Sequence, residues 1–503
     1  MKKQFMKKIL SYLFLASLVV VSSCKKEEAP VVYTVPTVTT SQTATTVVAG
    51  QGGKVTFTVG VDSKLTATYA ATGTNVTISN ASGSISGSTV EISFTTSAAG
   101  AGSVTLVVTD SEGNKSQATA VIQVDKVITE VVVTSNISAN TTWTADKVWV
   151  LGGRITVTAP ATLTIEPGTI IKGQAGAGAN ATSLLIARGA KINAAGTAAK
   201  PIIFTSVADE ISIADVAAGK FASPNLTPDI KGLWGGLIVL GKAKISASLS
   251  GAQLNEVQIE GIPTSDPNGL YGGTDDADNS GVLKYISVRH GGTEIGAGNE
   301  INGITFGGVG SGTVVENIEV IGNFDDGIEW FGGTVNCKNI VIWNAGDDGL
   351  DTDQAYRGTV ENFAVITAGG SQFELDGPEG TYGLDLSGHT FTKGFVVPTG
   401  GAGNLIDNDN NTVVNLRNIY AKGFSAVTQN ITEVFTNPYL STFGVVFENI
   451  TLDIPAANFL WQYVATATAA STIPSTISTG TTTYADLTVF NGWSWTAASD
   501  KLK

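Results

Sequence analysis

Two acidic segments of nearly the same sequence, which we call the acidic phrases, contain most of the residues that could carry out chemistry. Residues 325–329 read Asp-Asp-Gly-Ile-Glu and residues 347–351 read Asp-Asp-Gly-Leu-Asp, so each carboxylate recurs 22 residues later. Carboxylates that stack on one another cannot all stay ionised unaided, because each raises the pKa of its neighbour. Three uses resolve this conflict: ligation of Ca²⁺ by oxygens, general acid–base chemistry with a held proton, or turn residues with solvated side chains.

The elements that position these phrases form a repeat. Residues 316–321 (Glu-Asn-Ile-Glu-Val-Ile) return as residues 338–343 (Lys-Asn-Ile-Val-Ile-Trp), and a looser copy begins at residue 362. Short β-branched strands between Gly-rich turns at a fixed period predict the rungs of a stacked solenoid, with matching positions about 4.8 Å apart. Alternation predicts that Ile328 and Leu350 point into the core. A ladder at one corner of the coil is expected from three asparagines: Asn317, Asn339 and Asn362.

The same alternation predicts an outward-facing cation site. We expect Asp325 to stack on Asp347 and Glu329 to stack on Asp351, and these four carboxylates are the predicted Ca²⁺ ligands. A ligand-binding face would combine acids with neighbouring rings and a guanidinium: Trp330, Trp343, Glu329, Asp351, Asp353 and Arg357. Aromatic rings beside carboxylates can stack on and hydrogen-bond to a sugar. The open alternative is that a loop, such as residues 265–280, covers the aromatic stripe.

A resemblance extends the repeat over most of the chain. The phrase Thr164–Thr169, together with residues 196–197 and 201–204, is similar to the opening rungs of right-handed parallel β-helices of the pectate-lyase-like architecture. Residues 303–313 and the two acidic phrases resemble a group of bacterial envelope β-helix lipoproteins. The resemblance implies a β-helix over residues 127–503, and it implies no particular activity.

An enzymatic alternative rests on a second resemblance. Residues 323–327 and 346–348 resemble the acidic motifs of polygalacturonase-type glycosidases, which share the β-helix. Carried over by position, that resemblance implies three acid–base carboxylates: Asp326, Asp347 and Asp348. This chain departs from the family pattern, because the first motif has one residue too many and residues 369–372 stand where the family has a histidine motif. The nearby His389 lies too far along the chain to replace that motif. For a lyase, Arg357 is the one candidate base, so the sequence leans away from an enzyme.

The start of the chain carries the features of an exported lipoprotein. Residues 1–23 combine four lysines with an apolar run too short to span a bilayer, which predicts a signal peptide. The small residues before Cys24 resemble a bacterial lipoprotein processing box, which implies cleavage before Cys24 and lipidation of its thiol. We expect residues 24–46 to form a tether and residues 47–125, with their alternating short strands, to form an immunoglobulin-like sandwich.

Charge and cysteine content limit the classes of partner. The 503-residue chain has a formal net charge of −14, which becomes −18 without the signal peptide because four lysines and no acidic residue are lost. A surface this acidic excludes nucleic acid as a partner. With Cys24 lipidated, Cys337 is the second and last cysteine, so no intramolecular disulfide can form and stability must come from the core.

The predicted fold class is all-β, with an immunoglobulin-like sandwich followed by a long right-handed parallel β-helix. We expect a lipoprotein anchored in the outer membrane of a Gram-negative bacterium and exposed at the cell surface. Its β-helix is predicted to bind a glycan or another surface protein, with Ca²⁺ as the candidate cofactor. The alternatives are a polysaccharide-degrading glycosidase or lyase, and a structural stalk without a ligand. Residues 491–495, which include two tryptophans, are expected to close the last rung.

Overall fold

A computed structural model describes residues 31–40, 45–125, 129–296, 299–379, 388–398, 404–409, 411–424, 445–463, 469 and 475–503. The chain divides into two compact units, with the boundary between residues 127 and 128. The predicted signal peptide, Cys24 and the first part of the predicted tether lie outside the described residues. In the ranges that are described, no helix is long and apolar enough to cross a lipid bilayer.

The first unit is a sandwich of two β-sheets around one apolar core. Its strands are β1 (Thr37–Thr40), β2 (Thr45–Val48), β3 (Gly52–Gly60), β4 (Ala67–Thr74), β5 (Val76–Ile78), β6 (Ser82–Ser84), β7 (Thr89–Thr96), β8 (Gly100–Asp110) and β9 (Lys115–Asp125). One sheet has the order β1-β3-β7-β5 and the other the order β2-β9-β8-β4-β6. Alternate side chains of the long strands face inwards, so Phe57, Ile92 and Leu106 are fully buried. Because β1 and β2 begin before residue 47, the sandwich includes residues that the sequence assigned to the tether.

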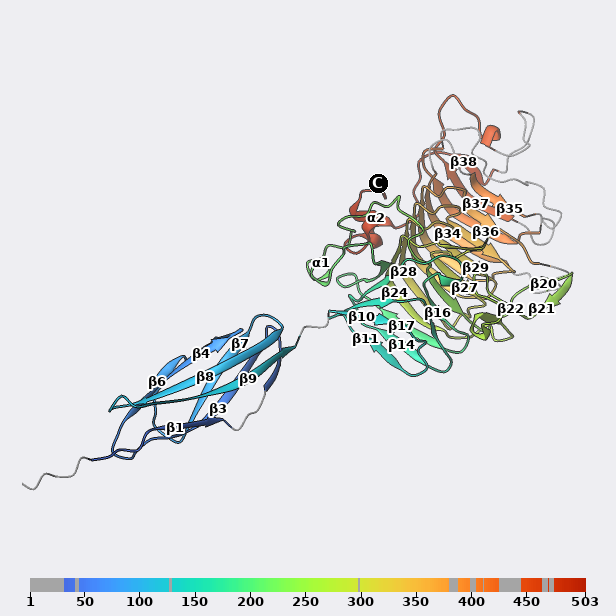
Figure 1. Cartoon of the computed structure of the whole chain (residues 1–503). Helices are drawn as coiled ribbons and strands as arrows, with labels where there is room; N and C mark the ends of the chain where they lie inside the picture. The colour runs from blue at the N-terminus through green and yellow to red at the C-terminus, as the bar shows by residue number, and fades with distance from the viewer. Residues whose placement is uncertain are drawn as a thin grey trace, which may run out of the picture. The chain divides into compact units, whose positions relative to one another are not determined.

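The second unit is a parallel β-helix whose strands stack rung upon rung in two sheets (Figure 1). The wide sheet contains β10 (Glu130–Val133), β11 (Thr141–Trp143), β12 (Val148–Leu151), β14 (Thr162–Ile165), β15 (Ile170–Gly173), β17 (Lys191–Ala195), β18 (Ile202–Ser206), β24 (Gly281–Arg289), β28 (Val314–Ile321), β30 (Asn336–Trp343), β32 (Thr359–Ile366), β34 (His389–Val397), β36 (Val414–Ala421), β37 (Val445–Leu452) and β38 (Ile477–Thr479). The narrow sheet contains β13 (Arg154–Val157), β16 (Ser183–Ile186), β19 (Leu237–Leu240), β27 (Ile304–Gly307), β29 (Ile328–Phe331), β31 (Leu350–Asp353), β33 (Ser371–Leu375) and β35 (Asn404–Asn408).

Short elements decorate the coil. Three hairpins pair β20 (Ala247–Leu249) with β21 (Ala252–Leu254), β22 (Glu256–Gln258) with β23 (Leu270–Gly272), and β25 (Glu294–Gly296) with β26 (Asn299–Glu300). The helices of the described residues are α1 (Ile213–Ala217), α2 (Trp495–Ala498) and the 3-10 turns η1 (Gly178–Asn180), η2 (Pro267–Gly269), η3 (Leu460–Tyr463) and η4 (Leu487–Phe490). Residues 245–272, which we call the flap, pack Ile245, Ile259 and Tyr271 against the outer face of the narrow sheet.

The wide-sheet strands bend at a corner formed by asparagines. Asn317, Asn339 and Asn362 have φ angles of 58°, 57° and 60°, in the left-handed region that asparagine tolerates better than most residues. Asn339 Nδ2 donates to Asn317 Oδ1 at 3.0 Å, and Asn362 Nδ2 donates to Asn339 Oδ1 at 2.8 Å. The predicted asparagine ladder is therefore confirmed.

The interior of the coil is a continuous apolar column. Ile318 lies opposite Ile340 in the wide sheet, and Ile328 lies opposite Leu350 in the narrow sheet. All four side chains are fully buried in one core cluster, which confirms the predicted inward positions of Ile328 and Leu350. Each rung is too small to bury these side chains alone, so the core exists only because rungs stack.

Residues 484–503, which we call the strap, cover the outer face of the wide sheet; α2 lies in this segment (Figure 1). Phe490, Trp493 and Trp495 pack on a stripe of wide-sheet side chains: Ile321, Val341, Trp343, Ala364 and Ile366. The expectation that residues 491–495 close the last rung is therefore wrong. They cover a flank of the coil, where an apolar stripe would otherwise face water.

Candidate functional site

The outer face of the narrow sheet carries carboxylates on four consecutive rungs. Glu329 lies opposite Asp351, Asp351 opposite Glu374, and Glu374 opposite Asp407. Neighbouring rows add four more acids, and together these eight residues are called the acidic face: Asp326, Glu329, Asp348, Asp351, Asp353, Glu374, Asp376 and Asp407. The flap borders this face, since its Tyr271 ring lies 6.1 Å from the ring of Phe331, two residues after Glu329.

The acidic face contains two triads that share Asp326. Carboxylate oxygens of Asp326, Glu329 and Asp351 lie within 4.8 Å of one another, and so do those of Asp326, Asp348 and Glu374. Asp348 N donates to Asp326 Oδ1 at 2.9 Å, and Ser371 N donates to Asp348 Oδ1. Each backbone N–H therefore fixes a carboxylate of the preceding rung.

One carboxylate oxygen in the first triad has no hydrogen-bond partner among the described residues. Asp351 is 8% exposed, and its Oδ1 is buried without a hydrogen bond among the described residues. Asn302 Nδ2 donates to Glu329 Oε2, while Asn302 Oδ1 is also buried and unpartnered in the described part of the chain. A buried polar oxygen without a partner costs free energy, so this corner of the site is set up for a donor or a cation.

The environment favours the protonated form of these acids. Burial raises the pKa of Asp326, Glu329 and Asp351 well above the ordinary range, and neighbouring carboxylates add to the effect. Burial also raises the pKa of Glu374 to about 9, helped by its hydrogen bond with Asp348. Neutralisation by a proton or by a cation is therefore required around pH 7.

Residues at the rim of the face titrate closer to neutrality. Burial raises the pKa of Asp353 to about 7, and the carboxylates of Glu379 and Asp376 add to this effect. Burial raises the pKa of Asp376 to about 6, with a further contribution from Asp409. Asp353 and Asp376 therefore lose their protons as the pH rises through neutrality, while the acids of the inner triads still hold theirs.

The predicted cation ligands are brought together only in part. Glu329 and Asp351 stack as expected, but Asp325 is half-buried and Asp347 is exposed, and neither belongs to a triad. Asp326 and Asp348 take their places, because the hydrogen bonds to the next rung turn the second carboxylate of each pair towards the narrow sheet. The predicted catalytic set is also partly assembled, since Asp326 and Asp348 share a triad and the charge of Asp347 contributes to the raised pKa of Asp348.

The two predicted ligand-binding tryptophans are not exposed, which corrects the proposed aromatic face. Trp330 is fully buried inside the coil, where its ring stacks on Tyr356 at 5.4 Å. It shares the inward direction of Ile328, two residues earlier in the strand. Trp343 does point outwards, but it is 6% exposed because Trp495 of the strap lies against it at 6.1 Å. The strap, rather than residues 265–280, covers the predicted stripe.

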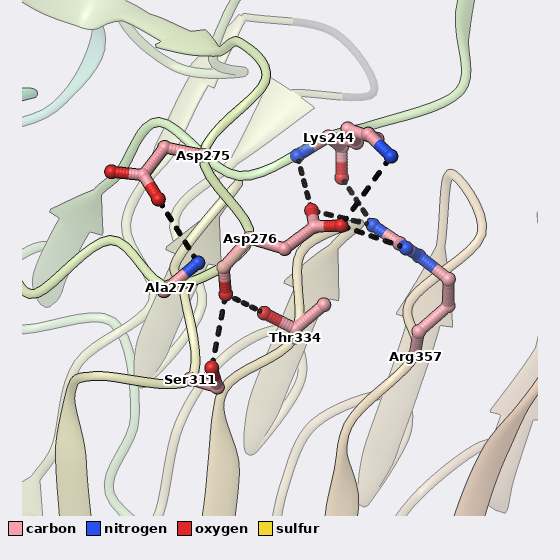
Figure 2. Close-up of polar contacts among 7 residues, drawn as sticks. All are labelled: Lys244, Asp275, Asp276, Ala277, Ser311, Thr334 and Arg357. Atoms are coloured by element: carbon pink, nitrogen blue, oxygen red, sulfur yellow. Dashed lines mark hydrogen bonds and ion pairs between the residues drawn. The ribbon is translucent and has the colours of Figure 1, made fainter.

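Arg357 forms an ion pair with a loop residue, Asp276, and is not available as a ligand-binding group. Its Nη2 contacts Asp276 Oδ1 at 2.9 Å, and Lys244 Nζ lies 3.6 Å from Asp276 Oδ2 (Figure 2). The Asp276 backbone oxygen accepts hydrogen bonds from Ser311 and Thr334 (Figure 2). This cation-bound aspartate fastens residues 273–280 across successive turns, and the predicted ligand role of Arg357 is replaced by a structural one.

Sequence reasoning missed three of the eight residues of the acidic face. Glu374, Asp376 and Asp407 were not predicted, because residues 369–372 break the Asp-Asp-Gly spelling of the two preceding rungs. A signal was present in the apolar–acidic alternation of residues 373–376 (Phe-Glu-Leu-Asp), which repeats the inward–outward pattern of Ile328 and Glu329.

The comparisons with known proteins agree with this architecture. The family model described as "Pectate-lyase like beta helix domain" matches residues 135–494. No curated protein matches the sequence.

Three solved structures each match about a fifth of the chain. A conjugative transposon lipoprotein from Bacteroides eggerthii has 14% identity and a TM-score of 0.15, with 17% of this chain and 95% of that chain covered. A lipoprotein from Bacteroides thetaiotaomicron has 13% identity and a TM-score of 0.16, with 20% and 85% covered. An I-band fragment of titin has 15% identity and a TM-score of 0.15, with 22% and 41% covered. At such TM-scores these likenesses support no conclusion about this chain.

Proposed function

The chain belongs to the pectate-lyase like beta helix family, and from this premise we propose that it is a polysaccharide-associated surface protein whose acidic face binds Ca²⁺. The observation that supports the proposal is the first triad. It joins three buried carboxylates within 4.8 Å, and one of them, Asp351, has an oxygen without a hydrogen-bond partner in the part of the chain that the structure describes. Calcium takes six to eight oxygen ligands, and carboxylates with a neutral amide such as Asn302 supply the type of oxygen it prefers.

Calcium binding would resolve the electrostatic conflict on this face. Three buried acids with raised pKa values must hold protons when no cation is present. A divalent ion competes with those protons, because carboxylate ligands must be ionised to bind it. The proposal therefore predicts proton release on binding and an affinity that rises with pH.

Thermal unfolding and calorimetric titration of the full chain test the cation proposal. Ca²⁺ added after EDTA treatment should raise the unfolding temperature by mass action, and Asp351→Asn should abolish the rise. Asp146→Asn is a matched control, because Asp146 is an exposed aspartate on an early rung of the same unit. If Ca²⁺ leaves the wild-type transition unchanged, the acidic face is not a calcium site.

The protein is also proposed to be lipid-anchored through Cys24 at the outer membrane. The supporting features are the lysine-rich apolar leader and the small residues before this cysteine. Mass spectrometry of protein purified from a Gram-negative membrane should find an acylated N-terminal Cys24. Cys24→Ala should move the protein from the membrane fraction into the soluble fraction. An unacylated N-terminus in the wild-type protein would refute the anchor.

Glycoside hydrolysis is the second candidate function. It is favoured by the pairing of Asp348, whose pKa is raised mainly by burial, with the exposed Asp347 beside it. A protonated carboxyl next to a second carboxylate is the arrangement that general acid catalysis of glycoside cleavage uses. Release of reducing ends from a polysaccharide panel, lost in Asp348→Asn, would establish the enzyme. A panel without cleavage, together with a Ca²⁺ response, would leave the binding function.

A further inference from the structure

A groove crosses the turns that lead from the wide sheet into the narrow sheet. It consists of two adjoining hollows of about 680 Å³ and 660 Å³, which share Lys231 and Gly369. One wall is the loop 227–231, and the floor is formed by three successive turns. Each hollow lies within the size range of natural ligand sites, which is about 300–1,000 Å³.

Glycines form part of the floor of the groove, beside Ala345 and Thr367. A Cβ atom at Gly346 would lie 1.6 Å from Phe324 O on the previous rung, and one at Gly369 would lie 2.1 Å from Gly346 O. Tight stacking of the turns therefore excludes side chains at both positions. A ligand can approach the peptide groups of successive rungs, which are spaced by about 4.8 Å.

An exposed aromatic ring stands at one end of the groove. Phe324 is 51% exposed although its backbone is fixed, since Phe324 N donates to Gly291 O at 3.0 Å. The opposite wall is fixed as well, because Lys231 Nζ donates to Ala345 O at 3.0 Å and Asn344 Nδ2 donates to Asp229 Oδ1 at 3.1 Å. The groove is thus pre-organised, and little order has to be gained on binding.

The polar lining mixes donors with acceptors. Asp325, Asp347 and Asp229 face Lys231 and Lys501, and the ammonium of Lys501 lies 5.4 Å from the centroid of the Trp343 ring. Three carboxylates against two ammonium groups disfavour an anionic ligand, in a chain whose net charge is already −14. A neutral chain rich in hydroxyl groups satisfies both kinds of lining group, because each hydroxyl donates and accepts.

We propose that this groove binds a neutral oligosaccharide lying along the rungs, with one sugar ring on Phe324 and its hydroxyls on Asp347 and Lys231. The ring supplies an apolar platform and the charged groups fix orientation, which is the usual division of labour in a ligand site. The inference rests on the polysaccharide association proposed above and goes beyond the cation proposal, because no residue of the first triad lines the groove and binding here needs no Ca²⁺.

Calorimetric titration of the full chain in EDTA tests the groove. The probes are three neutral hexasaccharides, cellohexaose, xylohexaose and mannohexaose, with hexagalacturonate as the anionic comparison. At least one neutral probe should bind, and Phe324→Ala should weaken it about tenfold, as expected for loss of a central aromatic anchor. Asp347→Ala should weaken it too, while Phe459→Ala is the matched control because Phe459 is 65% exposed and lines neither hollow.

Three results would overturn the assignment: no neutral probe binds at millimolar concentration, hexagalacturonate binds most tightly, or Phe324→Ala binds as the wild type does. Circular dichroism of each variant checks that the fold is intact. Asp351→Asn should keep the sugar affinity in EDTA, so a failure of the calcium proposal leaves this test unaffected.

Discussion

Thr496 donates two hydrogen bonds to Glu319 Oε1, from its backbone N and from Oγ1, each 2.8 Å long and across 177 residues of sequence. Glu319 Oε2 accepts from Ser287 Oγ at 2.6 Å and lies 3.7 Å from Arg289 Nη2. Glu319 and Arg289 are both fully buried, and the Arg289 guanidinium lies 5.1 Å from the ring centroid of Trp495. A buried ion pair therefore fastens the strap to the wide sheet.

Glu319→Gln should destabilise the β-helix unit by about 3–5 kcal/mol, because it leaves Arg289 buried without its counter-charge. Denaturant unfolding followed by tryptophan fluorescence measures this unit alone, since all eight tryptophans lie beyond residue 128. Glu316→Gln is the control on the same strand: its surface pair with Lys284 is worth about 0–1 kcal/mol. Equal effects of the two substitutions would contradict the fastening role.

Trp495→Ala should expose the stripe beneath the strap. Removing a large buried ring costs about 3–5 kcal/mol, and here it also uncovers Trp343. We expect increased binding of a hydrophobic dye and faster acrylamide quenching of tryptophan fluorescence. Unchanged quenching would show that other residues of the strap suffice to cover the stripe.

In EDTA, the unfolding temperature of the β-helix unit should fall as pH rises from about 5 to 9. Asp376, Asp353 and Glu374 have folded-state pKa values of about 6, 7 and 9, above the ordinary values of 3.8 and 4.5. The folded state binds the protons of these carboxyl groups more tightly than the unfolded state does. Their contribution to the stability of the folded state is therefore present at low pH and is lost as the pH rises through these pKa values. Glu374→Gln should flatten the upper part of the curve, and added Ca²⁺ should oppose the fall. A rise in stability with pH in EDTA would contradict the burial of these acids.

Two substitutions at Asn339 separate the backbone and side-chain roles of the ladder. Asn339→Gly keeps access to the left-handed φ of 57° but removes the hydrogen bonds to Asn317 and Asn362, whereas Asn339→Ala also adds backbone strain. We expect a loss of about 1–2 kcal/mol for glycine and a larger loss for alanine. Equal losses in denaturant unfolding would show that the left-handed conformation carries no cost here.

The rungs could be predicted because their pattern is local. The 22-residue period gave the stacking of Glu329 on Asp351, and alternation gave the inward positions of Ile328 and Leu350. The same alternation, applied to Trp330, would have placed that ring in the core. The prediction failed there because the tryptophan was judged by its neighbours in sequence and not by the parity of its strand.

The strap and the second triad could not be predicted in this way. Thr496 meets Glu319 through chain folding alone, and no periodicity links residues so far apart in sequence. Glu374 joins Asp326 and Asp348 because a backbone hydrogen bond turns Asp348 towards it, which depends on the geometry of a single turn. The sequence indicates which rungs carry acids, while the hydrogen bonds between turns decide which acids meet.

The strap makes the outer face of the wide sheet depend on contacts between segments that are far apart in the sequence. It covers a stripe assembled from strands that lie much earlier in the sequence, including Ile321, Val341 and Ala364. A chain interrupted before η4 would stack its rungs yet leave that stripe open to water, where unfolding and cleavage by proteases are easier.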